Sequence, residues 1–291
     1  MFKEITISFK KANSIIRLIY INIGFFLFFH ILKVFLLLTG YFNTPDTIKF
    51  ITDWFALKAD LNHILTKPWT LITFMFLHIK FIHLLYNILI LHFAGKIFQD
   101  YLGEKKLLST YIIGGLSGAI LLIVIYNISP VLQDYRNAPA FGASASAIAI
   151  LIAIATYAPN LKFNLPIIGS IAIKHIALAF ILIDIINFDD NNIGGHIGHL
   201  GGALWGFLYI TQYKKGNDMA TWFHKTLNII KGFFNKKNLK TVHSKTNNDY
   251  DYNEQKKNNQ KIIDSILDKI SKSGYDSLTK KEKEILFKNS K

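Results

Sequence analysis

Apolar residues gather in long runs along this chain, separated by shorter polar or charged stretches. Runs of about 20 apolar residues predict membrane-spanning helices, because a helix rises 1.5 Å per residue and the hydrocarbon core is about 30 Å thick. The pattern predicts an all-α membrane bundle of six spans, at residues 18–39, 69 or 71–94, 107–125, 142–158, 165–186 and 194–213. The upstream half of the second span can also be interpreted as a loop, and Lys174 and His175 leave the start of the fifth open.

The fourth run is short and opens on small residues, Gly142-Ala143-Ser144-Ala145-Ser146-Ala147. Small side chains let helix backbones approach closely in lipid, so this helix should be central. From Gly142 to the Pro159-Asn160 break it spans about 17 residues, or roughly 25 Å, less than the hydrocarbon core. One end should therefore stop inside the membrane. The end with Gly and Ser is the candidate, because a hydroxyl and a free helix N-terminus at that depth need a water-accessible cavity.

Outside the spans, residues 1–17 form a basic N-terminal segment, and residues 40–67 predict short interfacial helices. Residues 214–260 are a basic juxtamembrane segment and linker, in which 222–234 predicts an interfacial helix and 238–260 a disordered linker. Residues 261–291 predict a small helical module with helices at 261–272 and 277–290, the second opened by a capping box of Thr279 and Glu282.

The net charge of +14 lies mainly after the last span, because residues 214–291 hold 18 Lys against 9 acidic residues. A basic tail beside a membrane fits attraction to anionic lipid better than nucleic-acid binding, so no nucleic-acid partner is expected. Lys and Arg concentrate before the first span, between the second and third, and after the sixth, which predicts cytosolic termini. The first apolar run is interpreted as a retained anchor. The absence of Cys excludes disulfides and thiolate metal sites.

Three spans that run in the same direction carry polar residues at one depth. Ser144 lies 14 residues before Ala158, His199 15 before Lys214, and His83 13 before Lys96. At 1.5 Å per residue, all three should lie roughly 20 to 23 Å above the cytosolic face. Ionisable and hydroxyl groups sharing a layer inside a bundle indicate a functional site, because each would be costly facing lipid.

The sixth span carries His199 beside a glycine stripe, Gly198, Gly202 and Gly206, which allows close contact with the small face of the fourth span. His199 is thus a candidate general base for Ser144. His83 and Asn87 lie one turn apart on one face of the second span. With the Ser144 backbone N–H, they are candidate donors to a tetrahedral oxyanion.

These motifs resemble the rhomboid family of intramembrane serine proteases, over about residues 10–215. Gly142-Ala143-Ser144 matches the family's Gly-x-Ser motif at the start of a short fourth helix. His199 with Gly202 and Gly206 matches the sixth helix, and His83 with Asn87, preceded by His78, matches the second. The tail from Ile262 to Ser290 resembles a small module on some bacterial rhomboids, and no role follows for it.

The resemblance implies that Ser144 is the nucleophile and His199 its base, with no third acidic residue and no cofactor or metal. It implies that His83, Asn87 and the Ser144 backbone form the oxyanion site. The expected function is an endopeptidase of the cell membrane that cleaves transmembrane-anchored proteins near the outer membrane–water boundary through an acyl-enzyme. Four positions depart from the family pattern and leave the tuning of loop and cavity open: Thr70, Gln99, Ala145 and Ile148.

Several alternatives stay open on the sequence. Ser146 is a competing nucleophile, His196 is interpreted as a solvated cap, and His78 as a cavity or a surface residue. A zinc site is a further alternative, in which Asp184 near the outer end of the fifth span is the only carboxylate within a span; its histidines would be His78, His83, His92, His196 and His199. At the level of function, the rivals are a non-proteolytic rhomboid-like protein that binds membrane clients, and a transporter.

Overall fold

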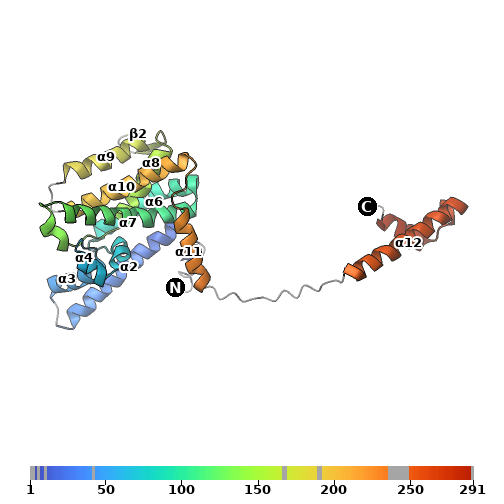
Figure 1. Ribbon diagram of the computed structural model, residues 1–291, viewed down its shortest axis with the longest axis horizontal. Coiled ribbons are helices and arrows are strands. Elements are labelled where there is room, and N and C mark those ends of the chain that lie inside the picture. The colour runs from blue at the N-terminus through green and yellow to red at the C-terminus, as the bar shows by residue number, and fades with distance from the viewer. Residues whose placement is uncertain are drawn as a thin grey trace. The chain divides into compact units, whose positions relative to one another are not determined.

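The computed structural model describes residues 4, 7–9, 12–40, 43–165, 169–188, 192–234 and 249–289, and the chain divides into two compact units between Phe234 and Asn235. The predicted segment 1–17 and linker 238–260 lie partly outside the described residues. The first unit is a helix bundle, in which α9 and α2 lie at opposite sides (Figure 1). Its main helices are α2 (Ser14–Leu38), α6 (Phe81–Leu102), α7 (Glu104–Ile128), α8 (Ser144–Tyr157), α9 (Ile173–Ile186) and α10 (Ile193–Lys214).

The all-α class is confirmed, and the chain is a multi-pass membrane protein. Helices α2, α6 and α7 are each long and apolar enough to cross a membrane, and α8 is a shorter apolar helix. Large apolar side chains on α2 face outward, such as Ile31 and Leu38, which are 69% and 81% exposed. In water such a surface would be unfavourable, whereas lipid accommodates it. The number of six spans stays a prediction.

Helix α8 is the centre of the bundle. Its residues from Ala145 to Ala155 are all buried, and α6, α7, α9 and α10 pack around it. Glycines on α7 allow this closeness: a Cβ atom at Gly114 would lie 2.3 Å from the Ala149 Cβ, and one at Gly115 would lie 2.6 Å from the Ser146 Oγ. The helix has 14 residues and is therefore about 21 Å long, which is shorter still than the roughly 25 Å predicted from the length of the apolar run.

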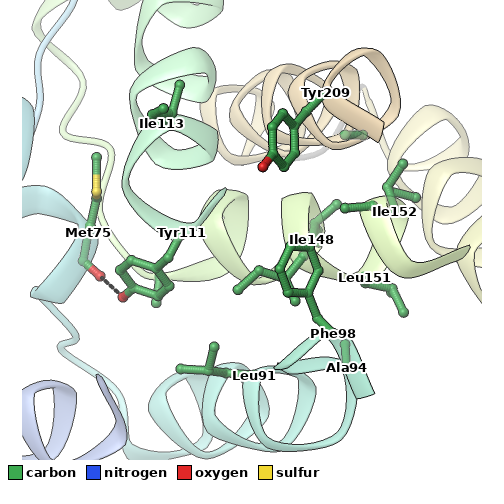
Figure 2. Packing of buried hydrophobic residues seen from close by; sticks show 14 of the residues in the cluster. Met75, Leu91, Ala94, Phe98, Tyr111, Ile113, Ile148, Leu151, Ile152 and Tyr209 are labelled. Carbon is green, nitrogen blue, oxygen red and sulfur yellow. Dashed lines mark hydrogen bonds between the residues drawn. The ribbon is translucent and has the colours of Figure 1, made fainter. Parts of the chain in front are cut away.

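Larger side chains fill the layer around α8 (Figure 2). Tyr111 of α7 lies inside this core with its hydroxyl near the Met75 carbonyl, 3.5 Å away. Asn22 of α2 donates to the same hydroxyl at 3.1 Å, so α2 and α7 are joined by a buried polar contact. The hydroxyl thus has partners although Tyr111 is fully buried, as a polar group in this environment requires. The apolar residues labelled around it are Leu91, Ala94, Phe98, Ile113, Ile148, Leu151, Ile152 and Tyr209.

Short elements between α2 and α6 confirm that no span lies there: α3 (Thr44–Phe55), α4 (Leu61–Thr66), α5 (Thr70–Thr73) and η1 (Phe74–Phe76). For the second span, predicted from residue 69 or 71, the alternative of a loop in its first half is confirmed, because α6 begins only at Phe81. The apolar residues Phe74, Met75 and Leu77 are instead buried as a folded loop. Backbone bonds tie this loop in place: Leu57 and Ala140 exchange two, and Gly142 N donates to the Phe74 oxygen at 2.8 Å.

The predicted fifth span is wrong at its start. Two short strands precede the helix instead: β1 (Lys162–Leu165) and β2 (Gly169–Ala172) pair antiparallel, from Lys162 with Ala172 to Leu165 with Gly169. Gly169 has a φ of +80°, which other residues adopt rarely. Polar and apolar residues alternate along Lys162-Phe163-Asn164-Leu165, a period-2 pattern masked by the long apolar run that follows. The helix that remains, α9, has 14 residues.

After α10 the first unit ends with α11 (Thr221–Phe234), the helix predicted there. The second unit contains α12 (Asp249–Ser273), η3 (Tyr275–Ser277) and α13 (Lys280–Asn289). Helix α12 begins twelve residues earlier than predicted, and residues 249–260 hold no Gly or Pro that would stop it. The capping box is confirmed, because Glu282 accepts from Thr279 N at 2.7 Å, and Lys269 joins α12 to α13 by binding Glu282.

Candidate active site

Ser144 is the first residue of α8. The two residues before it, Gly142 and Ala143, contact His83, Phe74 and His78. Gly142 has a φ of +122°, and a Cβ atom there would lie 2.6 Å from the His83 Cε1. Both constraints call for glycine, since any side chain would strain the backbone and collide with the imidazole. Gly142 N donates to the Phe74 oxygen at 2.8 Å and Ala143 N to His78 Nε2 at 3.3 Å. The Ser144 N–H begins the helix and has no intrahelical acceptor.

The structure brings Ser144 and His199 together. Ser144 Oγ lies 2.7 Å from His199 Nε2, a hydrogen-bond distance, and the His199 side chain is 18% exposed. Close packing of α10 on α8 sets this distance. A Cβ atom at Gly202 would lie 2.1 Å from the Ala145 oxygen, and one at Gly206 would lie 2.2 Å from the Ala149 oxygen. No residue other than glycine fits at these two positions without moving the helices apart.

The third member of the predicted stripe, Gly198, does not take part in this packing: a Cβ atom there would have no atom within 4 Å. The predicted stripe does not include Gly201, which packs tightly: a Cβ atom there would lie 2.7 Å from the Gly118 Cα on α7. Ser117 of α7 donates to the Gly201 oxygen at 2.8 Å. Helix α10 therefore presents one glycine face to α8 and another to α7.

An acidic residue also contacts His199, contrary to the expectation of a pair without one. Asp184 of α9 is 4% exposed, and its Oδ1 lies 2.8 Å from His199 Nδ1. The same oxygen lies 2.8 Å from His196 Nδ1. The interpretation of His196 as a solvated cap is wrong, because it is 8% exposed and bonded to Asp184. A single carboxylate in an apolar run, with two histidines three residues apart in the next span, was the signal available in the sequence.

The predicted oxyanion residues lie around the start of α8. The His83 ring contacts Gly142 and packs 5.1 Å from the His78 ring, between centroids. Asn87 is 1% exposed, and its Nδ2 donates to the His83 carbonyl at 2.8 Å and lies 3.4 Å from His78 Nε2. The Asn87 amide is thus engaged within the protein, whereas His83 and the Ser144 N–H are the freer donors. His78 is fully buried, which rules out its interpretation as a surface residue.

A cavity of about 780 Å³ opens beside Ser144 and His199. Its wall is mixed: apolar and aromatic side chains, such as Tyr86 and Phe141, lie next to the polar side chains of His83, Ser144, Asp184 and His199. Ser146, the competing nucleophile, does not line this cavity. Its Oγ is buried against α7, where a Cβ atom at Gly115 would lie 2.6 Å away. Only one of the two serines therefore faces the histidine.

The four positions that depart from the family pattern have different surroundings. Ala145 packs against α10, and Ile148 lines the cavity. Thr70 is buried and donates to the Lys67 oxygen at 2.7 Å. The Gln99 Oε1 is buried without a partner among the described residues. None of the four separates Ser144 from His199.

Asp184, His196 and His199 also form a candidate metal cluster, with ligand atoms within 4.8 Å of one another. The contacts already account for this cluster as hydrogen bonds, because each imidazole N–H can donate to the carboxylate oxygen at 2.8 Å. A metal would instead require both Nδ1 atoms deprotonated and facing the ion. The hydrogen-bonded arrangement leaves His199 Nε2 for Ser144.

Comparison with known proteins identifies the fold. The model of the Rhomboid domain family matches residues 65–215, more than half of the chain. The chain belongs to the rhomboid family. All the residues of the site, from His78 to His199, lie inside the matched segment of this rhomboid chain.

A curated relative and a second family model also match this chain. The presenilin-associated rhomboid-like protein A, mitochondrial, of Danio rerio is 26% identical over 205 residues, which cover 65% of this chain. The chain spans about half the length of this relative. Residues 246–291 match a family of unknown function (DUF6576), so the tail that follows the rhomboid domain is itself a recurring module.

Proposed function

We propose that this rhomboid chain is an intramembrane serine endopeptidase that cleaves transmembrane-anchored proteins through an acyl-enzyme on Ser144. One observation carries the proposal: Ser144 Oγ lies 2.7 Å from His199 Nε2 at the wall of a cavity in the membrane domain. A nucleophile within hydrogen-bond reach of a base is what acyl transfer by serine needs. Chains that keep the fold without proteolysis would not need both residues in this arrangement.

In the first step, His199 Nε2 takes the proton of the Ser144 hydroxyl while Oγ attacks the scissile carbonyl carbon. Proton transfer and attack are coupled, because a serine hydroxyl is a weak nucleophile at neutral pH. The carbonyl oxygen becomes an oxyanion and needs donors already in place. The Ser144 backbone N–H and the His83 imidazole are the proposed donors, and Asn87 holds His83 through its carbonyl.

In the second step, the tetrahedral intermediate collapses, and the leaving amine takes the proton from His199. An acyl-enzyme on Ser144 Oγ remains. Water in the cavity then loses a proton to His199 Nε2 and attacks the ester carbonyl. When this second intermediate collapses, His199 returns the proton to Ser144 Oγ, which restores the hydroxyl and releases the new carboxyl terminus. No metal or cofactor takes part in this sequence.

The depth of the site suggests the kind of substrate. Helix α8 is about 21 Å long, so its N-terminal tip with Ser144 lies within the bilayer if its other end is at the interface. A substrate helix must expose a carbonyl there, which favours cleavage near the outer membrane–water boundary, where a helix can unwind against water. The proposed location is the cell membrane with both termini cytosolic, on the distribution of Lys and Arg.

The test uses the full chain in proteoliposomes with a single-span protein substrate and, separately, a fluorophosphonate probe. We expect cleavage and labelling by the natural chain, and neither by Ser144→Ala or, beyond residual levels, His199→Ala. The matched control is Ser146→Ala, which removes the same hydroxyl two residues away, on the face toward α7. It should retain labelling.

Retained cleavage in Ser144→Ala would refute the proposal. If the natural chain and Ser144→Ala behave alike in every assay, the rhomboid-like, client-binding alternative becomes the better account. Solute flux across the same proteoliposomes would point to transport instead.

A further inference from the structure

The side chain of Asp184 is the strongest polar feature that the proposed dyad leaves unused. Helix α9 is otherwise apolar along this stretch, and the neighbours Ile183 and Ile185 are each 54% exposed, whereas Asp184 is 4% exposed. A carboxylate facing lipid would be costly, and this one faces α10. Its Oδ1 lies 2.8 Å from the Nδ1 atoms of both His196 and His199.

The contact decides which nitrogen of His199 carries the proton. A carboxylate only accepts hydrogen bonds, so the Nδ1 atom beside it must be N–H. Neutral imidazole has one proton, and Nε2 is then a lone pair. That lone pair is 2.7 Å from Ser144 Oγ and can accept the hydroxyl proton. The three contacts form one chain, from serine to imidazole to carboxylate.

We propose that Asp184 is a positioning residue for His199, so that this chain works with a Ser144–His199–Asp184 triad instead of a dyad. The proposal rests on the proposed function of the same site. When His199 takes the serine proton it becomes an imidazolium with N–H at both nitrogens. Asp184 stays ionised and stabilises that cation, so no proton moves to the carboxylate.

His196 has a different role, although it bonds the same oxygen. It lies one turn before His199 on α10, and its ring centroid is 6.1 Å from that of His199. It is 8% exposed, and its hydrogen bond among the described residues goes to Asp184 and not to Ser144, so it holds the carboxylate rather than the nucleophile. Asp184 has two possible roles, to join α9 to α10 and to orient His199. Because His196 takes part only in the first, an experiment can separate them.

The test compares Asp184→Asn with His196→Ala. Asparagine keeps the shape of the side chain and one acceptor oxygen, which can still join the helices, but its amide can present N–H to His199 Nδ1. That reverses the tautomer and places the proton on Nε2. We expect kcat to fall by about 10³- to 10⁴-fold with KM changed less than fivefold, the size of the effect in soluble serine proteases. In His196→Ala we expect kcat within tenfold of the natural chain.

Two further measurements keep the proposal falsifiable. The melting temperatures of Asp184→Asn and His196→Ala in detergent should be similar, which shows that lost activity does not report lost folding. Nitrogen-15 NMR of labelled histidine, with His199→Gln to assign the signal, should show the proton on Nδ1 in the natural chain and on Nε2 in Asp184→Asn. Asp184→Glu restores a carboxylate and should recover at least tenfold over Asp184→Asn.

The failure of this inference is distinguishable from failure of the proposed function. If Ser144→Ala is inactive but Asp184→Asn keeps kcat within fivefold of the natural chain, the triad is refuted and the dyad stands. If Asp184→Asn and His196→Ala lose equal activity, Asp184 only joins the helices. Loss of activity on treatment with EDTA that Zn²⁺ alone restores would also overturn the triad, because both Nδ1 atoms would then be metal ligands.

Discussion

Replacing Gly202 by Ala should move α10 away from α8 at the level of Ser144 and His199. A Cβ atom at Gly202 would lie 2.1 Å from the backbone oxygen of Ala145, and real Cβ atoms essentially never come closer than 3.0 Å to such a neighbour. The atom in the way is backbone in a fully packed helix, so it cannot rotate aside. The two helices must therefore part by about 1 Å at this point.

That movement acts directly on the proposed catalytic contact. If the added separation carries through in full, the Ser144 Oγ to His199 Nε2 distance grows from 2.7 Å to about 3.6 Å, beyond a useful hydrogen bond. A misplacement of 1 Å can cost on the order of 10²-fold in rate. We expect Gly202→Ala to lower kcat by about 100-fold and, through overpacking, to destabilise the bundle by about 1–3 kcal/mol.

The matched control is Gly198→Ala, on the same helix and one turn earlier. A Cβ atom there would meet nothing within 4 Å. Both changes replace a helical glycine by alanine, and each gains up to about 1 kcal/mol of helix propensity, so their difference isolates the clash. Cleavage of a single-span substrate, fluorophosphonate labelling rate and melting temperature are measured for both. A Gly202→Ala protein that cleaves within threefold of Gly198→Ala would refute the reasoning.

Two further predictions concern Gly142 and the tail. Gly142→Ala should abolish most fluorophosphonate labelling, because a φ of +122° and a Cβ 2.6 Å from the His83 ring both oppose alanine; an unchanged rate would contradict this. The pKa of Glu282 is lowered to about 2, first by the Thr279 N–H and then by Lys269, from an ordinary 4.5. Its stabilisation of the tail is therefore complete above about pH 4.5 and should be lost as the pH falls to about 2. NMR titration of the Glu282 carboxyl carbon would follow this, and Thr279→Ala should move the midpoint upward; a natural-chain midpoint near 4.5 would count against it.

The sequence predicts the centre of the bundle well because residue size carries the information there. Ala and Gly at the start of the fourth run predict close helix contacts, and Gly202 and Gly206 make them. The prediction that Gly198 packs against α8 was wrong for a geometric reason. Residues four apart are turned by about 400°, so a stripe of this spacing slants around the helix by about 40° at each step. Its first member therefore leaves the face toward α8, while Gly201 comes to face α7.

For two histidines, the position along a span does not predict whether the side chain is buried. His78 and His196 both lie near span ends, where solvation is the ordinary expectation. Their burial comes from partners distant in sequence: the Ala143 N–H reaches His78, and Asp184 reaches His196. The residue pattern of one helix cannot predict these contacts, because they depend on how a loop and a neighbouring helix pack against that helix.

Asp184 was passed over because the predicted fifth span starts at residue 165, whereas β2 (Gly169–Ala172) lies there and α9 begins only at Ile173. Counted from residue 165, Asp184 would stand about 29 Å along a helix, at the outer end, whereas from the observed start at Ile173 it stands only about 17 Å along. Ile173 is also joined to the chain just after α8, because its N–H donates to the oxygen of Leu161, four residues beyond the helix end, at 2.8 Å. From that shared end, Ser144 stands about 21 Å away along α8, within one helical turn of Asp184. The carboxylate therefore belongs to the same layer as Ser144, His199 and His83, and the difference of about 12 Å arises because α9 starts at Ile173 instead of residue 165.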